Sequence, residues 1–252
     1  MRRSAVSIAL ATLPLAAGQP LVYQDGATRL AGYIARPPAV KGTVPGILVI
    51  HQWLGLTDHE RTTADRLAEL GYVALAADIF GEGVRPKDVK EAGVQATLYK
   101  SDRALYRRRI KAGLDALKAQ AGVDPSRLAV IGFCFGGTGA IEAARAGMPV
   151  KGIVSFHGGL DFTPDPQAPP ITAKLLICHG ADDPFVPPKD VAAFQDDMRR
   201  LKADYVFMAF AGAVHAFTQK EAGNDPANGF AYNEAAARRS WQAMKDFFGE
   251  IF

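Results

Sequence analysis

Short apolar runs that alternate with longer stretches of helical spacing constrain the fold of this chain more than any other feature. The apolar runs occupy residues 46–51, 73–77, 127–133, 150–156 and 173–179. Between and after them, apolar residues recur with helical spacing at 58–70, 87–99, 102–121, 136–146, 189–201 and 233–248. Strands connected through helices run parallel, and helices then cover both faces of the sheet. The sequence therefore predicts an α/β fold with a mostly parallel central sheet.

A β-hairpin is predicted ahead of the first buried strand, because residues 21–24 and 29–35 flank Asp25-Gly26, a strong two-residue turn. No internal repeat or linker divides the rest of the chain. The irregular loops 158–172 and 220–231 are too short to form a domain of their own. We therefore expect residues 19–252 to form a single domain without a separate lid domain.

Residues 1–18 have the composition of a secretory signal peptide. Arg2 and Arg3 precede an apolar stretch at 5–17, which ends in small residues. The apolar stretch is too short to span a bilayer, so no membrane span is predicted. This leader predicts a periplasmic or secreted protein; the alternative is a frayed N-terminal segment of a cytoplasmic protein.

Composition and charge argue against several classes of protein. Hydrophobic residues make up 48% of the chain and charged residues 22%, as in ordinary globular proteins, and the net charge is only +3. The densest basic run, 103–111, has helical spacing and is interpreted as a solvated helix face, so no nucleic-acid partner is predicted. The five histidines lack the spacing of metal ligands, and His59-Glu60 does not continue into an H-E-x-x-H zinc motif. We expect neither a metal nor an organic cofactor.

Cys134 is the candidate nucleophile. It lies in a G-x-C-x-G sequence at 132–136, directly after an apolar strand and directly before a helical stretch, which is the context of a nucleophile elbow. A helix N-terminus also favours the thiolate, the reactive form of cysteine. The other cysteine, Cys178, ends an apolar run and is interpreted as a small buried side chain.

Two later loops supply candidate partners for this nucleophile. Asp182 and Asp183 follow the strand at 173–179, and His215 follows the apolar run 206–210. A carboxylate there would orient an imidazole, and the imidazole would act as the base. The backbone N–H groups of Phe135 and Trp53 are the candidate oxyanion-hole donors. These residues predict hydrolysis of a small ester or lactone through a thioester.

The same residues resemble the dienelactone hydrolase family. The resemblance rests on G-x-C-x-G-G at 132–137, G-x-x-D-P-F-V-P at 180–187 and G-x-x-H-x-F at 212–217, together with H-Q-W-L-G-L at 51–56 and the segment 71–81. It covers nearly the whole chain after the leader. It implies an α/β-hydrolase fold and a triad of Cys134, Asp183 and His215, with Asp182 as the alternative acid.

Two positions depart from the pattern of that family. Gln52 stands where the resemblance implies a glutamate that helps to form the thiolate, and Gln219 stands where it implies an arginine that binds a substrate carboxylate. Neither amide carries a charge. A neutral ester or lactone is therefore favoured over an anionic dienelactone. Gln52, Trp53, Phe135, Phe185 and Phe217 are the candidate residues lining the substrate pocket.

Two other interpretations remain open at this point. The chain could be a catalytically silent protein of the same fold that binds a small ligand, since Gln52 replaces an ionisable group. It could also be a peptidase or acyl-peptide hydrolase of the same fold, although it has no additional domain to select peptides. The oligomeric state is not predicted.

Overall fold

The computed structural model describes residues 18–39 and 42–252, so nearly all of the predicted leader lies outside the described residues. These residues form one eight-stranded sheet in the order β1-β2-β4-β3-β5-β6-β7-β8. The strands are β1 (Gln19–Asp25), β2 (Thr28–Ala35), β3 (Val44–Ile50), β4 (Val73–Ala77), β5 (Val123–Phe133), β6 (Gly152–Phe156), β7 (Lys174–Gly180) and β8 (Tyr205–Phe210).

The sheet is mostly parallel, as predicted. The hairpin β1-β2 is antiparallel and adds to β4 in an antiparallel sense, whereas every pair from β4 to β8 is parallel. Strand β5 begins at Val123, four residues before the predicted start. Val123 and Asp124 pair with the first residues of β3, and a register shift then separates this pairing from the buried part of the strand.

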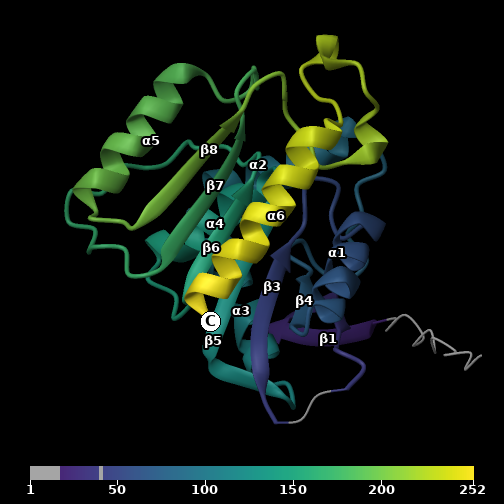
Figure 1. Cartoon of the computed structure of the whole chain (residues 1–252). Helices are drawn as coiled ribbons and strands as arrows, with labels where there is room; N and C mark the ends of the chain where they lie inside the picture. Colours follow the sequence, from purple (N-terminus) through teal and green to yellow (C-terminus); the bar gives the residue numbers. More distant parts are fainter. Residues whose placement is uncertain (1–17, 40–41) are drawn as a thin grey trace, which may run out of the picture.

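Helices cover both faces of the sheet (Figure 1). They are α1 (Asp58–Glu69), α2 (Val89–Ser101), α3 (Arg103–Lys118), α4 (Phe135–Arg145), α5 (Pro188–Arg200) and α6 (Glu234–Ile251), with the short 3-10 helices η1 (Lys220–Ala222) and η2 (Pro226–Asn228) in the loop before α6. Helices α1 and α6 pack on one face, and α2, α3, α4 and α5 on the other. The predicted α/β-hydrolase fold is confirmed.

Each strand divides its side chains between two apolar cores, because successive residues of a strand point to opposite faces. In β3, Leu48 and Ile50 join the core that contains Tyr106 of α3. Ile47 and Val49 join the core that contains Leu67 of α1. The two cores hold the sheet rigid and leave its carboxyl edge, where β3, β5, β7 and β8 end, to the loops that carry the candidate site.

No helix among residues 18–39 and 42–252 is long and apolar enough to cross a membrane. The predicted absence of a membrane span is therefore tested only for this part of the chain.

Candidate active site

Cys134 lies at a sharp turn between β5 and α4. Its backbone dihedrals are φ 52° and ψ −116°, a conformation that costs a residue with a side chain on the order of 1–3 kcal/mol. The two flanking glycines make the turn possible. A Cβ atom on Gly132 would lie 2.0 Å from the carbonyl oxygen of Gly136, and one on Gly136 would lie 2.2 Å from that of Ile50. The G-x-C-x-G spacing therefore follows from the close approach of β5, α4 and β3.

His215 connects the thiol to Asp183. Its Nδ1 donates to Asp183 Oδ2 over 2.7 Å, and His215 lines the same cavity as Cys134. Asp183 is fully buried at its side chain, and its Oδ1 accepts the backbone N–H of Phe185 over 2.9 Å. The backbone of His215 is held by Gly229, whose carbonyl accepts its N–H over 3.1 Å. The imidazole is thus oriented by a buried carboxylate in the cavity that also contains Cys134.

The neighbouring Asp182 has a different partner. Its Oδ2 accepts the backbone N–H of Gly212 over 2.9 Å, which joins the loop after β7 to the loop after β8. Of the two candidate acids, the structure brings only Asp183 to His215.

The electrostatics of the site favour an ion pair between thiolate and imidazolium. Burial alone would raise the pKa of the Cys134 thiol, but the charge and hydrogen bond of His215 and the N–H of Phe135 hold it below its ordinary value. Burial lowers the pKa of His215, yet the charge of Cys134 and the hydrogen bonds to Asp183 and Cys134 raise it to about 10. Each of the two groups therefore favours the charged form of the other.

We expect iodoacetamide to alkylate Cys134 at pH values where an ordinary thiol, with a pKa of about 8.5, hardly reacts. Burial raises the pKa of Cys178 far above that value, so Cys178 should stay unmodified in the folded protein. Intact-mass measurements between about pH 5 and pH 10 give the rate at each cysteine.

The matched variant for this measurement is His215→Asn, which removes the cation. At about pH 6 it should slow alkylation at least tenfold, because each unit by which the thiol pKa rises lowers the thiolate fraction tenfold. A wild-type rate that rises only through the ordinary thiol range would contradict the ion pair.

The candidate oxyanion donors come from two segments, the first turn of α4 and the loop after β3. The N–H of Phe135 reaches Cys134 from the first turn of α4. Trp53 belongs to the loop after β3, where its neighbours are fixed: Leu54 N–H donates to Gln52 Oε1 over 3.0 Å, and Gly55 N–H to the Gln52 carbonyl over 3.1 Å. Among the described residues, the N–H of Trp53 has no such partner, so it is available to an oxygen of the substrate.

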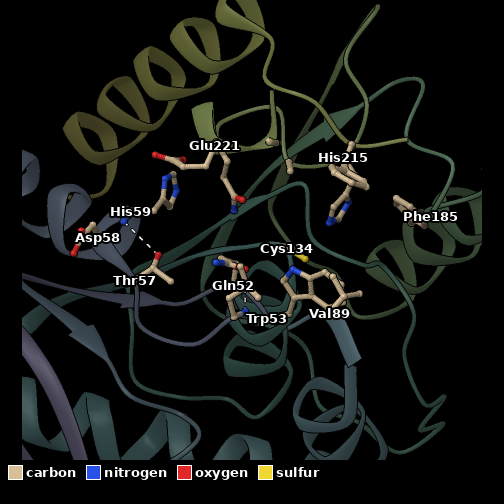
Figure 2. Close-up of a pocket in the computed structure, with 15 residues that line it drawn as sticks. Gln52, Trp53, Thr57, Asp58, His59, Val89, Cys134, Phe185, His215 and Glu221 are labelled. Atoms are coloured by element: carbon tan, nitrogen blue, oxygen red, sulfur yellow. Dashed lines mark hydrogen bonds between the residues drawn. The ribbon is translucent and has the colours of Figure 1, made fainter. Parts of the chain in front are cut away.

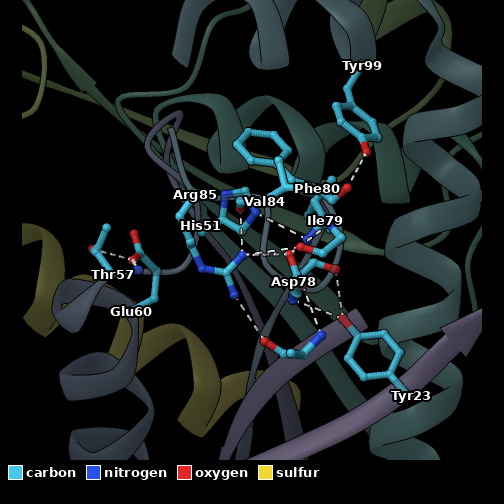
Figure 3. A network of polar contacts seen from close by, with 12 residues as sticks. Tyr23, His51, Thr57, Glu60, Asp78, Ile79, Phe80, Val84, Arg85 and Tyr99 are labelled. Carbon is cyan, nitrogen blue, oxygen red and sulfur yellow. Dashed lines mark hydrogen bonds and ion pairs between the residues drawn. The ribbon is translucent and has the colours of Figure 1, made fainter. Parts of the chain in front are cut away.

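Two buried ionisable side chains that the sequence interpretation missed hold this loop (Figure 3). The ring of His51 donates from Nδ1 to the Gln52 carbonyl over 2.6 Å and accepts the Ile79 N–H at Nε2 over 3.2 Å. Burial is the main reason that the pKa of His51 is lowered, so this ring is neutral. Glu60 accepts the Gln52 N–H over 3.2 Å and the Thr57 N–H over 2.9 Å. The carbonyl and the N–H of Gln52 are therefore both held by hydrogen bonds to buried side chains.

Replacing Glu60 with glutamine should disturb the loop, because both carboxylate oxygens accept backbone N–H groups and an amide has only one acceptor oxygen. We expect a loss of about 1–3 kcal/mol in the free energy of unfolding and a several-fold lower kcat. Urea denaturation and ester hydrolysis measure the two effects. Glu69→Gln, at the exposed end of the same helix, is the control and should change neither.

His157 is a third residue that the motifs did not indicate. It follows β6, is fully buried, and accepts the Cys134 N–H at Nδ1 over 3.2 Å, while that N–H also reaches the Phe156 carbonyl over 3.0 Å. Its Nε2 lies 2.8 Å from Thr218 Oγ1. Burial is the main reason that its pKa is held well below the ordinary value. A neutral imidazole thus supports the backbone of the elbow.

A cavity of about 850 Å³ opens beside the thiol (Figure 2). Its walls come from the loop after β3, the starts of α1 and α2, and the loops after β7 and β8. Of the predicted pocket residues, Gln52, Trp53 and Phe185 line it. This volume suits a small organic substrate.

Two predicted pocket residues do not line that cavity, and these predictions are corrected. The ring of Phe217 is fully buried and packs edge-on against His157, at a centroid distance of 5.1 Å. The ring of Phe135 stacks on Tyr106 at 4.5 Å, so only its backbone faces the site. Both side chains point from the backbone toward the sheet, so their rings pack in the apolar cores.

Comparison with known proteins decides the family. A model of the dienelactone hydrolase family matches residues 30–252, which include all the residues of the candidate site. The chain belongs to this family. Membership makes it an ester or lactone hydrolase.

Similar proteins align with most of this dienelactone hydrolase family member, and each alignment also covers most of the relative's own chain. A metagenomic protein whose crystal structure is described as a dienelactone hydrolase-like promiscuous phosphotriesterase is 42% identical, with a TM-score of 0.87 and coverage of 93% of this chain and 98% of its own. A Bradyrhizobium protein named provisionally as a 2-oxo-3-(5-oxofuran-2-ylidene)propanoate lactonase is 30% identical over 86% of this chain and 87% of its own. A Synechocystis protein named provisionally as a carboxymethylenebutenolidase is 30% identical over 87% and 91%.

The two departures from the family pattern have distinct places in the structure. Gln52 is almost fully buried and uses its side-chain oxygen to support the turn at Leu54. Gln219 lies on the loop after β8 and lines the cavity. This family member therefore has an amide in the cavity wall at both positions, and His215 is the main group that lowers the pKa of the Cys134 thiol.

Proposed function

We propose that this chain hydrolyses a small neutral carboxylic ester or lactone with Cys134 as nucleophile, His215 as base and Asp183 as the residue that orients the base. The observation that carries the proposal is the hydrogen bond by which the buried carboxylate of Asp183 orients His215, a residue that lines the same cavity as Cys134. The imidazole is oriented by a 2.7 Å hydrogen bond and lies beside a thiol whose pKa is lowered. That is the arrangement nucleophilic catalysis requires.

In the first half-reaction, the Cys134 thiolate attacks the carbonyl carbon and forms a C–S bond. The oxyanion accepts hydrogen bonds from the backbone N–H groups of Phe135 and Trp53. As the tetrahedral intermediate collapses, the C–O bond to the leaving group breaks and His215 donates its proton to the departing oxygen. The product of this step is a thioester on Cys134 and a free alcohol, or a ring-opened hydroxyacyl group if the substrate is a lactone.

In the second half-reaction, His215 removes a proton from water as the water oxygen attacks the thioester carbonyl. The same N–H groups hold the second oxyanion, and collapse breaks the C–S bond and returns the thiolate of Cys134. Asp183 stabilises the imidazolium at each stage and keeps its Nδ1–H directed away from the substrate.

The test is to trap the thioester. The protein is mixed with a nitrophenyl ester of a short-chain acid, quenched in acid within the first turnovers, and analysed by peptide mass spectrometry. We expect the acyl group on Cys134 in the wild type and in Cys178→Ala, the matched variant of the other cysteine. An acyl group on another residue, or hydrolysis that persists in a folded Cys134→Ala variant, would overturn the proposal.

The same experiment separates the alternative functions. A silent ligand-binding protein would form no acyl adduct and release no nitrophenol. A peptidase would cleave peptide nitroanilides at rates comparable with nitrophenyl esters.

Phosphotriester hydrolysis is a second candidate activity, favoured by the 42% identity to the promiscuous phosphotriesterase. Attack of the Cys134 thiolate on phosphorus would expel nitrophenolate from diethyl nitrophenyl phosphate and leave a phosphorylated cysteine for water to hydrolyse. Nitrophenol release from this compound by the wild type and not by Cys134→Ala is the expected result. Stoichiometric release without turnover would show inhibition in place of hydrolysis.

A further inference from the structure

The cavity extends well beyond the residues that perform the proposed chemistry. In Figure 2, Cys134, His215 and Phe185 lie on one side, and Thr57, His59 and Glu221 lie on the other. The second group comes from the start of α1 and from η1, two segments far apart in the sequence. Together with Gln219 they form what we call the distal subsite, defined by Thr57, Asp58, His59, Gln219 and Glu221.

The fixed charges of the distal subsite are negative. None of the described residues that line the cavity is a lysine or an arginine, whereas Asp58 and Glu221 both line it. Asp58 is paired with Arg61 on the exposed side of α1 at 2.9 Å. Glu221 makes no ion pair with any of the described residues. A carboxylate in the substrate would face these two carboxylates, and the nearby Arg61 is already bound to Asp58.

Two cations of neighbouring segments are bound elsewhere. Arg85 donates to the Val84 carbonyl over 2.7 Å and lies 3.6 Å from the buried Asp78. Lys100 pairs with Asp161 at 3.2 Å. Moving either side chain into the cavity would break these contacts and leave a carboxylate without its partner.

Two polar atoms of neutral side chains in the distal subsite have no hydrogen-bond partner among the described residues. The amide nitrogen of Gln219 and the Nε2 of His59 are both buried, and neither has a partner among the described residues. Burial is the main reason that the pKa of His59 is lowered, so its ring is uncharged near neutral pH. Unpaired buried polar atoms are unfavourable by about 1–3 kcal/mol each, and small rotations of an amide or an imidazole let a ligand supply the partner.

We propose that the distal subsite binds the part of the substrate remote from the scissile carbonyl through an uncharged oxygen, a ketone or hydroxyl, that hydrogen-bonds to Gln219 and His59, and that it rejects substrates with a carboxylate there. This proposal depends on the proposed function in one respect only, which is the position of the scissile group. It defines the substrate class as neutral oxygenated esters or lactones. Both Gln219 and His59 can donate or accept, so they suit either oxygen group.

The test measures binding and not turnover, so that it is independent of the nucleophile. Three nitroanilides of similar length are titrated calorimetrically into the full chain: 5-oxohexanoyl with a neutral oxygen, glutaryl with a carboxylate, and hexanoyl with a plain alkyl end. We expect the 5-oxohexanoyl compound to bind at least about tenfold more tightly than the glutaryl compound, and several-fold more tightly than the hexanoyl compound.

Two variants of Gln219 make the test specific. Gln219→Leu should remove the preference for 5-oxohexanoyl over hexanoyl. Gln219→Arg, with its folding checked by circular dichroism, should reverse the preference between glutaryl and 5-oxohexanoyl. Equal or tighter binding of the glutaryl compound by the wild type, equal binding of all three, or binding of none would overturn the proposal. Loss of ester hydrolysis in Cys134→Ala, by contrast, concerns only the proposed nucleophile.

Discussion

Replacing Asp183 with asparagine is expected to lower kcat for ester hydrolysis by about 10³- to 10⁴-fold. Asp183 is fully buried and accepts the Nδ1–H of His215 over 2.7 Å. An asparagine that presents its NH₂ group to this nitrogen would favour the wrong tautomer, with the proton on the nitrogen that faces the thiol. The imidazolium would also lose its counter-charge, so the thiolate of Cys134 would be less populated near neutral pH.

Asp182→Asn is the matched control, because it makes the same change in the adjacent residue. Asp182 accepts the Gly212 N–H and does not contact His215, so kcat should stay within about twofold. Stopped assays with a nitrophenyl ester give kcat and KM for both variants. If Asp182→Asn has the larger effect, the acid has been assigned to the wrong residue.

The alkylation rate of Cys134 in Asp183→Asn distinguishes a specific effect on the thiol from unfolding of the variant. In a folded variant, alkylation of Cys134 at about pH 6 should slow, since the cation that lowers the thiol pKa is less stable without its carboxylate. A variant with full thiol reactivity but no turnover would place the role of Asp183 in the deacylation step alone.

The sequence predicted those parts of the site where the backbone geometry requires particular residues close together in the chain. Cys134 needs glycines two residues before and two residues after it, because Gly132 and Gly136 lie against other backbone atoms at less than 3 Å from any added Cβ. A requirement of this kind concerns residues close together in the chain, so it appears in the sequence as a recognisable motif. The strand and helix order was predictable for a similar reason, since buried parallel strands leave uninterrupted apolar runs.

The parts that sequence missed depend on contacts between distant segments. His157 touches the backbone of Cys134 only because β5 and β6 are adjacent, and a lone histidine after a strand gives no hint of that pairing. His51 reaches Ile79 across two strands. Phe217 was placed in the pocket from its nearness to His215 in sequence, but residues two apart in a loop can point in opposite directions, and its ring lies in the core.

The structure also accounts for an apparent conflict between the two amides and a working thiolate. Gln52 cannot accept a proton from Cys134, and its side-chain oxygen is bonded to Leu54 N–H. Thiol activation therefore falls to His215, whose pKa is raised to about 10 by Cys134 and Asp183. A site that depends on a single imidazolium should be especially sensitive to anything that moves the elbow.

Gly132→Ala is expected to move the elbow and to lower the free energy of unfolding by about 3 kcal/mol or more, at the upper end of the range for overpacking. The new Cβ would lie 2.0 Å from the carbonyl oxygen of Gly136 and 2.2 Å from its carbonyl carbon. These are backbone atoms of α4, so no rotation of a side chain relieves the contact. Either β5 or α4 must shift, and the thiol of Cys134 shifts with them.

Gly249→Ala is the control for this change. Gly249 lies on the exposed side of α6, and an added Cβ there meets no atom within 4 Å. Alanine should therefore stabilise the protein by about 0.5–1 kcal/mol through its higher helix propensity. Urea denaturation measures both variants. If Gly132→Ala were as stable as the wild type and alkylated equally fast at Cys134, the close contact between β5 and α4 would not be what forces the thiol into its strained position.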